Sequence, residues 1–172
     1  MTLLPVLLAL ALAASASLAA AAPADGTPLG ALAEREWTDQ FGGRGGLATH
    51  RGQPLVVVVV DARRLAQVRR WEEQLLTRFP DLPLVTVADV NETKPPELAR
   101  VQAVLARRVP REVVVLIDLQ REWARALELD TAAPNLLLVD QASRVTARFR
   151  GRWTAAEGER VLAAVAALRD AP

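Results

Sequence analysis

Four aspartates stand at the ends of predicted strands, where they could hold a divalent metal ion. Asp61, Asp89, Asp118 and Asp140 each end, or nearly end, a run of aliphatic residues. Open α/β sheets bind ligands beyond the carboxyl ends of parallel strands, and carboxylates there suit Mg²⁺ or Ca²⁺. Aspartate is also favoured in helix caps and turns, which explains each of the four separately. We therefore predict no metal site and keep, as the alternative hypothesis, a non-thiol enzyme that uses strand-end carboxylates with a divalent metal.

Arginines crowd the start of the helix predicted after the first aspartate, at Arg63, Arg64, Arg69 and Arg70. Guanidinium groups beside unpaired helix N–H donors would bind an anion or an acidic peptide. Cations at this end of a helix oppose its dipole unless anions lie near, and Glu72 and Glu73 are close enough in sequence to pair with them. The cluster is thus either a binding site or a solvated, partly paired face.

Composition excludes several classes of function. The sequence has no cysteine, so it can form no disulfide, thiolate nucleophile or cysteine zinc site. Its only histidine, His50, has no Ser or Cys partner in a recognised arrangement, and we predict no catalytic residue and no cofactor. With 21 Lys+Arg against 20 Asp+Glu, the net charge of +1 argues against a nucleic-acid partner.

The N-terminus predicts export. Residues 1–22 carry no charged side chain and consist almost wholly of Leu, Val, Ala and Ser. This pattern is typical of a signal peptide, with cleavage after Ala21 or Ala24. A retained membrane anchor is the alternative, because about 20 apolar residues can span a bilayer. We predict cleavage, no membrane span afterwards, and a periplasmic or secreted protein.

The mature chain is predicted to fold as one domain over residues 34–170, after a flexible, Pro/Gly/Ala-rich lead-in at 23–33. Short extended pieces around the glycines at 42–46 indicate a hairpin. The run LVVVVV at 55–60 indicates a central strand buried on both faces. Apolar spacing predicts further strands at 84–90, 113–117, 136–139 and 145–150, and helices at 62–79, 97–108, 119–129 and 154–168.

Three segments carry a resemblance to a known family. They are 38–42 (TDQFG) with 50–57 (HRGQPLVV), 115–118 (VLID) with 123–127 (WARAL), and 132–140 (AAPNLLLVD) with Val145 and Gly151. In this order they resemble the thioredoxin-like superfamily, nearest its peroxiredoxin/TlpA-type redoxin branch, and within it the exported, cysteine-free YtfJ-like proteins. The resemblance implies an α/β thioredoxin-like fold, in which helices flank a central mixed sheet and a hairpin extends the N-terminus.

The resemblance also places two features of the family on this sequence. Pro134 stands where the family has a cis-proline, and a cis Ala133–Pro134 bond would expose backbone groups to an extended peptide. The alternative is an ordinary trans proline at the start of a strand. The family's cysteines would fall at 61–65, which here reads DARRL and holds no sulfur, so thiol oxidoreductase and peroxidase chemistry is excluded.

These observations predict an exported, monomeric, redox-inactive protein that binds a protein or peptide partner whose identity is unknown. The predicted binding residues lie around the position of the missing cysteines, at Asp61, Arg63, Arg64, Ala133, Pro134 and Asn135.

Overall fold

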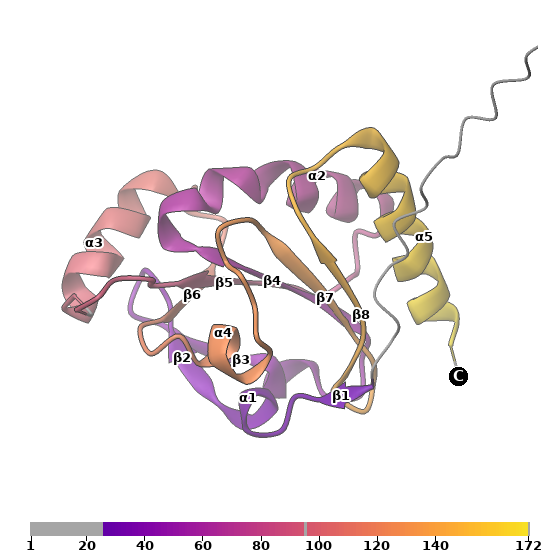
Figure 1. The fold of residues 1–172 in the computed structure, drawn as a ribbon, viewed down its shortest axis with the longest axis horizontal. Helices are drawn as coiled ribbons and strands as arrows, with labels where there is room; N and C mark the ends of the chain where they lie inside the picture. The colour runs from indigo at the N-terminus through magenta and orange to yellow at the C-terminus, as the bar shows by residue number, and fades with distance from the viewer. Residues whose placement is uncertain (1–25, 95, 172) are drawn as a thin grey trace, which may run out of the picture.

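The computed structural model describes residues 26–94 and 96–171, which form an α/β domain around a six-stranded mixed sheet (Figure 1). The strand order is β1-β8-β7-β4-β5-β6. The strands are β1 (Thr27–Pro28), β4 (Leu55–Asp61), β5 (Leu84–Asp89), β6 (Val115–Asp118), β7 (Asn135–Val139) and β8 (Arg144–Arg150). Strands β4, β5 and β6 are parallel, whereas β7, β8 and β1 continue the sheet in antiparallel pairings.

The central position of β4 follows from its composition. Every residue of this strand is buried, and it pairs with β5 on one side and β7 on the other. Val57 and Val59 face one core, while Val56 and Val58 face the other. A strand covered on both faces needs an uninterrupted apolar run rather than an alternating one, so the prediction for 55–60 is confirmed.

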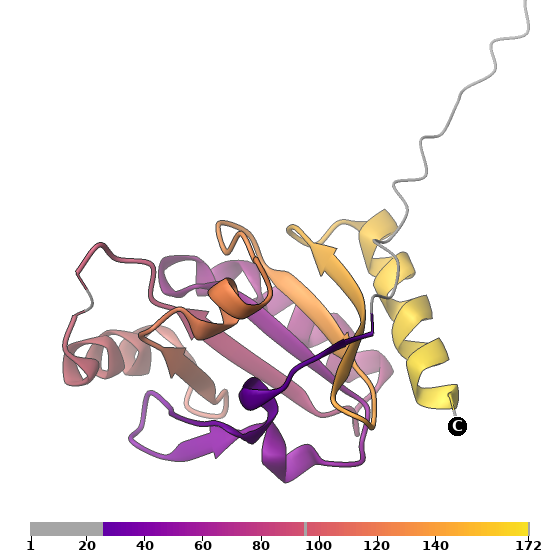
Figure 2. The same ribbon diagram turned by 60° about the horizontal axis from the view of Figure 1, so that its bottom comes forward.

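Helices α2 (Arg69–Arg78), α3 (Leu98–Arg108) and α5 (Ala155–Asp170) cover one face of the sheet. The opposite face carries α1 (Ala31–Glu34), the hairpin of β2 (Glu36–Thr38) and β3 (Arg44–Gly46), and α4 (Glu122–Ala126). Figure 2 brings this second layer forward. Two short 3₁₀ segments, η1 (Leu47–His50) and η2 (Ala62–Gln67), complete the elements.

The hairpin protects the exposed edge of β6. The Gln40 side chain donates to the Val113 carbonyl at 2.6 Å and accepts from the Val115 backbone N–H at 2.8 Å. A single backbone bridge also joins Asp39 to Leu116. A buried amide thus takes the place of a neighbouring strand at an edge that would otherwise invite pairing with other chains.

The predicted lead-in needs correction. Residues 27–33 are not a flexible extension, because Thr27 pairs with Val145 in β8 and the next turn enters α1. Leu29 and Leu32 are buried in the core beneath the hairpin. These two buried leucines make residues 27–33 part of the packed domain. The predicted signal peptide at 1–22 lies outside the described residues.

Two helices are also shorter than their periodicity predicts. The segment expected at 62–79 begins as the 3₁₀ turn η2 and becomes α-helical only at Arg69, and the one expected at 119–129 is α-helical only from Glu122 to Ala126. The second arm of the hairpin region, at 47–50, is η1 rather than extended. None of the helices in the described part of the chain is both long and apolar enough to cross a bilayer.

Candidate binding site at the carboxyl end of the sheet

Three of the four predicted strand-end aspartates lie side by side. Asp61 is the register partner of Asp89, and Asp89 is the register partner of Asp118, on three adjacent parallel strands. We call these three residues the aspartate row; each is at most 3% exposed. Asp140 lies at the other end of the sheet, in the β7–β8 turn, where its carboxylate accepts from the backbone N–H groups of Ala142 and Arg144.

Asp61 is bound by Arg63. The Arg63 guanidinium reaches both carboxylate oxygens, with Nε 2.9 Å from Oδ1 and Nη2 2.6 Å from Oδ2, and its backbone N–H donates to Oδ1 at 2.8 Å. Burial raises the pKa of Asp61, but these hydrogen bonds and the positive charges of Arg63 and Arg64 outweigh it, and the net shift is below the ordinary value. The prediction that Asp61 caps the following helix is confirmed.

The other two carboxylates of the row also have partners. Asp89 is fully buried; its Oδ1 lies 3.3 Å from Arg121 Nε, and its Oδ2 accepts from the Thr131 hydroxyl at 2.5 Å. Asp118 accepts from the backbone N–H groups of Gln120 and Trp123 and so holds the start of α4. Residues 26–94 and 96–171 contain no group of three or more His, Cys, Asp or Glu that could hold a metal ion.

The loop before β7 is held by Asn135. Its buried side-chain amide donates to the backbone carbonyls of Asp130 and Ala133, both at 2.9 Å. No peptide bond in the described residues is cis, so the predicted cis Ala133–Pro134 bond is wrong. Pro134 is a trans residue directly before a strand, where the lack of an N–H costs nothing, and its carbonyl accepts from Gly151 N–H at 2.9 Å.

The six predicted binding residues therefore lie at one end of the sheet but differ in accessibility. Asp61, Pro134 and Asn135 are buried and satisfied by neighbours, and Ala133 is half-buried. Arg63 keeps 65% of its side chain exposed despite its ion pair, and Arg64 is exposed. The two arginines line a shallow recess of about 460 Å³ together with Ala66 and Gln67. We call this recess and its two arginines the arginine pole.

Sequence reasoning missed Thr131 and Arg121, which complete the site of Asp89. Thr131 lies 42 positions from Asp89 in a loop, and Arg121 has a left-handed backbone at φ 56°. Neither residue belongs to a periodic pattern. Thr131 stands between Asp130 and Ala132, and this local sequence does not distinguish it from other loop residues.

The comparisons with known proteins concern the fold alone. No protein-family model matches the sequence, and no curated protein matches it. Among solved structures, it is similar to the pneumococcal exposed lipoprotein thioredoxin Etrx1 from Streptococcus pneumoniae, with a TM-score of 0.63, 14% identity and coverage of 78% of this chain and 98% of that one. For dsbF from MTB the TM-score is 0.60 at 17% identity, with coverage of 83% and 98%. Peroxiredoxin Q from Xanthomonas campestris gives 0.59 at 14% identity, with coverage of 84% and 97%.

The domain thus has a thioredoxin-like fold, and its structural neighbours are redoxins, as the sequence motifs predict. The chain differs from proteins named for thiol chemistry in holding no cysteine at all. The carboxyl end of its central strands instead carries a buried row of hydrogen-bonded carboxylates and two exposed guanidinium groups.

Proposed function

We propose that this chain is an exported, redox-inactive thioredoxin-fold protein that binds an acidic segment of a protein partner at the arginine pole. The observation that carries the proposal is the contrast between Arg64 and the carboxylates beneath it. Within the described residues no acceptor pairs with the Arg64 guanidinium, whereas each member of the aspartate row already has a donor. The Arg64 guanidinium can therefore bind an anionic group of a ligand.

The chemistry of the chain supports a binding role over a redox role. Thiol–disulfide exchange and cysteine-based peroxide reduction both need a sulfur nucleophile, and the sequence has none. Export is supported by the uncharged, apolar residues 1–22. One structural neighbour is named as an exposed lipoprotein, which is consistent with this fold serving outside the cytoplasm.

The test is charge reversal at Arg64, followed by crosslinking capture from the native envelope. We expect a partner that wild type enriches to be lost from Arg64→Glu. The matched control is Arg100→Glu, which reverses an exposed arginine on α3 that does not line the recess. Arg63 is left intact, because a carboxylate at position 63 would face Asp61 and disturb the fold.

Two results would overturn the proposal. Equal recovery of every partner by wild type and Arg64→Glu would show that the arginine pole is not the contact surface. Equal loss from Arg64→Glu and Arg100→Glu would show that binding follows the net charge of the domain and uses no defined site.

A further inference from the structure

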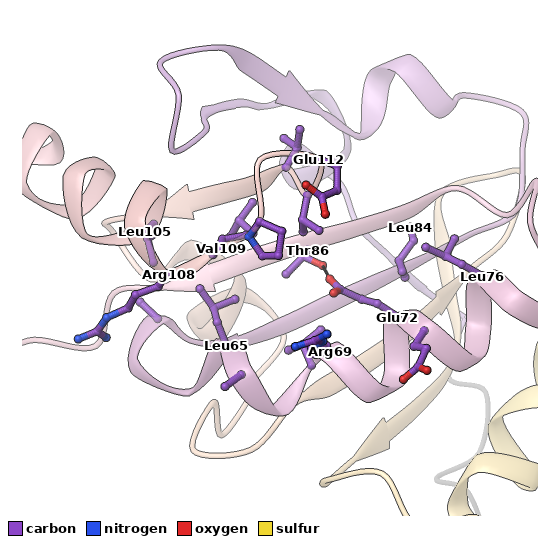
Figure 3. A pocket seen from close by; sticks show the side chains of 18 of the residues that line it. Leu65, Arg69, Glu72, Leu76, Leu84, Thr86, Leu105, Arg108, Val109 and Glu112 are labelled. Atoms are coloured by element: carbon purple, nitrogen blue, oxygen red, sulfur yellow. Dashed lines mark hydrogen bonds between the residues drawn. The ribbon is translucent and has the colours of Figure 1, made fainter.

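A second concave surface lies between α2 and α3, on the face of the sheet away from the hairpin. This groove, of about 980 Å³, is the α2–α3 groove (Figure 3). Leu65, Leu76 and Val109 belong to its walls, and Leu84 and Thr86 of β5 form its floor. It meets the arginine pole only at Arg63 and Ala66.

The groove exists because the two helices pack on different cores. Trp71 and Leu75 of α2 join a cluster with α5, whereas Val101 and Leu105 of α3 join a separate cluster with β6. The strip of sheet between the two clusters is therefore not closed by direct packing of one helix on the other. Leu65, which is partly buried, packs against both clusters.

Exposed apolar side chains gather at this groove. Within the described part of the chain, three large apolar side chains are exposed, and two of them, Leu76 at 42% and Val114 at 54%, line it. They come from different walls, one from α2 and one from the segment just before β6. The third, Phe41, lies in the turn of the hairpin. Apolar side chains that line one concave surface indicate an interaction site.

Charges of both signs surround the apolar surface. Arg69 and Glu72 come from α2, Arg108 from the end of α3, and Glu112 from the segment between α3 and β6 (Figure 3). Glu72 reaches the floor, where its Oε1 accepts from the Thr86 hydroxyl at 2.7 Å. An anionic lipid would meet the two glutamates as well as the two arginines. A peptide with acidic and basic residues beside its apolar ones complements both signs.

The floor of the groove also favours a helical peptide over an extended one. Strand β5 is hydrogen-bonded to β4 on one side and β6 on the other, so its backbone offers no free partner to an added strand. An extended peptide lying on this face would leave its own backbone groups unpaired. A helix satisfies its backbone internally and needs only an apolar stripe.

We propose that the α2–α3 groove binds an amphipathic helix of a partner protein, with apolar residues at positions i, i+3 or i+4, and i+7 and with charges of both signs beside them. This site goes beyond the proposed function, because it uses a different surface and a different chemistry from the arginine pole. An apolar stripe on such a helix would cover Leu76 and Val114 and leave Arg64 untouched.

The test is a selection of displayed peptides on the full chain. Two libraries of about 18 residues share one composition; one places its apolar residues at helical spacing and the other at the strand spacing of two. We expect enrichment from the helical library alone. The enriched peptides should bind Leu76→Glu and Val114→Glu about tenfold more weakly or worse, because each change places a charge in the apolar contact. Circular dichroism and thermal melts check that both variants fold.

Phe41→Glu is the matched control, since it changes the third exposed apolar side chain outside the groove; with Arg64→Glu, it should leave peptide affinity unchanged. Enrichment of strand-spaced peptides, no enrichment, or equal binding to the groove variants would overturn the proposal. The proposal would also be overturned if the groove had a different occupant. Saturable binding of oleate that Leu76→Glu abolishes would indicate a lipid, and a dimer that Leu76→Glu dissociates would indicate a second copy of the chain. Because the arginine pole is tested by a different variant, either proposal can fail alone.

Discussion

The aspartate row and the α2–α3 groove are built in opposite ways. In the row, three carboxylates that water would hydrate strongly are buried, and each is neutralised or hydrogen-bonded by its own neighbours. In the groove, apolar side chains that water hydrates poorly are exposed, and within the described residues nothing covers them. The comparison teaches that buried polar groups with hydrogen-bond partners stabilise the fold. Exposed apolar side chains, which have no such partners, are the part of the surface that a ligand can cover.

The largest expected effect lies in the aspartate row, at Thr131. The change Thr131→Val keeps the shape of the side chain but removes the hydroxyl that donates to buried Asp89. We expect the free energy of unfolding to fall by about 2–3 kcal/mol, because a buried carboxylate oxygen loses its donor. Urea denaturation measures this loss. Thr77→Val is the control: it removes an exposed hydroxyl bonded to the Glu73 carbonyl and should cost far less. Equal costs would mean that the row does not depend on its partners.

The second largest expected effect is on the pH dependence of stability, which tests whether Arg63 stabilises the Asp61 carboxylate. The pKa of Asp61 is depressed in the folded state, because burial raises it less than the hydrogen bonds and charge of Arg63 lower it. A depressed pKa contributes stability that is present above the unfolded value, near 3.8, and is lost as the pH falls through the folded value. Wild type should therefore lose stability below about pH 4.

In Arg63→Gln, the burial of Asp61 is no longer opposed by the guanidinium, and the pKa of its carboxyl should rise. The variant should be less stable than wild type at pH 7, and the gap should narrow as the pH falls toward 4. Thermal midpoints measured from pH 3 to pH 7 give the difference curve. Arg70→Gln, which breaks only an exposed pair with Glu73, should run parallel to wild type. If the curve for Arg63→Gln also ran parallel to wild type, Arg63 would not be stabilising the Asp61 carboxylate.

The parts of this fold that the sequence predicted are those decided locally. The run of largely β-branched residues at 55–60 favours a doubly buried strand, and the Asp61 cap depends on a residue two positions away. The positions of Asp61, Asp89 and Asp118 at strand ends were also predicted, and the parallel register brings these three ends together. At these positions the preference of the local sequence agrees with the structure of the whole domain, so the local sequence alone predicts the correct element.

The parts that it did not predict depend on distant packing. Burial of Leu29 and Leu32 requires the far edge of the sheet, and the Thr131–Asp89 bond joins a loop to the end of β5, 42 positions away in the sequence. The α2–α3 groove reflects which cluster each helix joins, and no property of either helix alone reveals it. The prediction of a cis bond before Pro134 was wrong, and it rested on the family resemblance alone rather than on the residues around it.

At the two proposed binding surfaces, in contrast to the aspartate row, we expect the variants that test binding to change the free energy of unfolding little. Arg64 makes no ion pair among the described residues, and Leu76 is substantially exposed. Arg64→Glu and Leu76→Glu should each change the free energy of unfolding by no more than about 0.5 kcal/mol. Urea denaturation of both beside Thr131→Val tests this. A large loss in Leu76→Glu would mean that the groove wall contributes to the core rather than to a ligand.

The smallest expected effect is that of divalent metal, and it decides whether the aspartate row could serve an enzyme. A metal that binds the folded state stabilises it in proportion to the logarithm of its concentration over Kd. To bind the row, Mg²⁺ or Ca²⁺ would have to displace Arg63 from Asp61, Thr131 from Asp89 and two backbone N–H groups from Asp118. Millimolar Mg²⁺, Ca²⁺ or Mn²⁺ should therefore leave the thermal midpoint unchanged. A rise that Asp61→Asn and Asp89→Asn both abolish would reverse the comparison, because the satisfied region would then be the one that accepts a ligand.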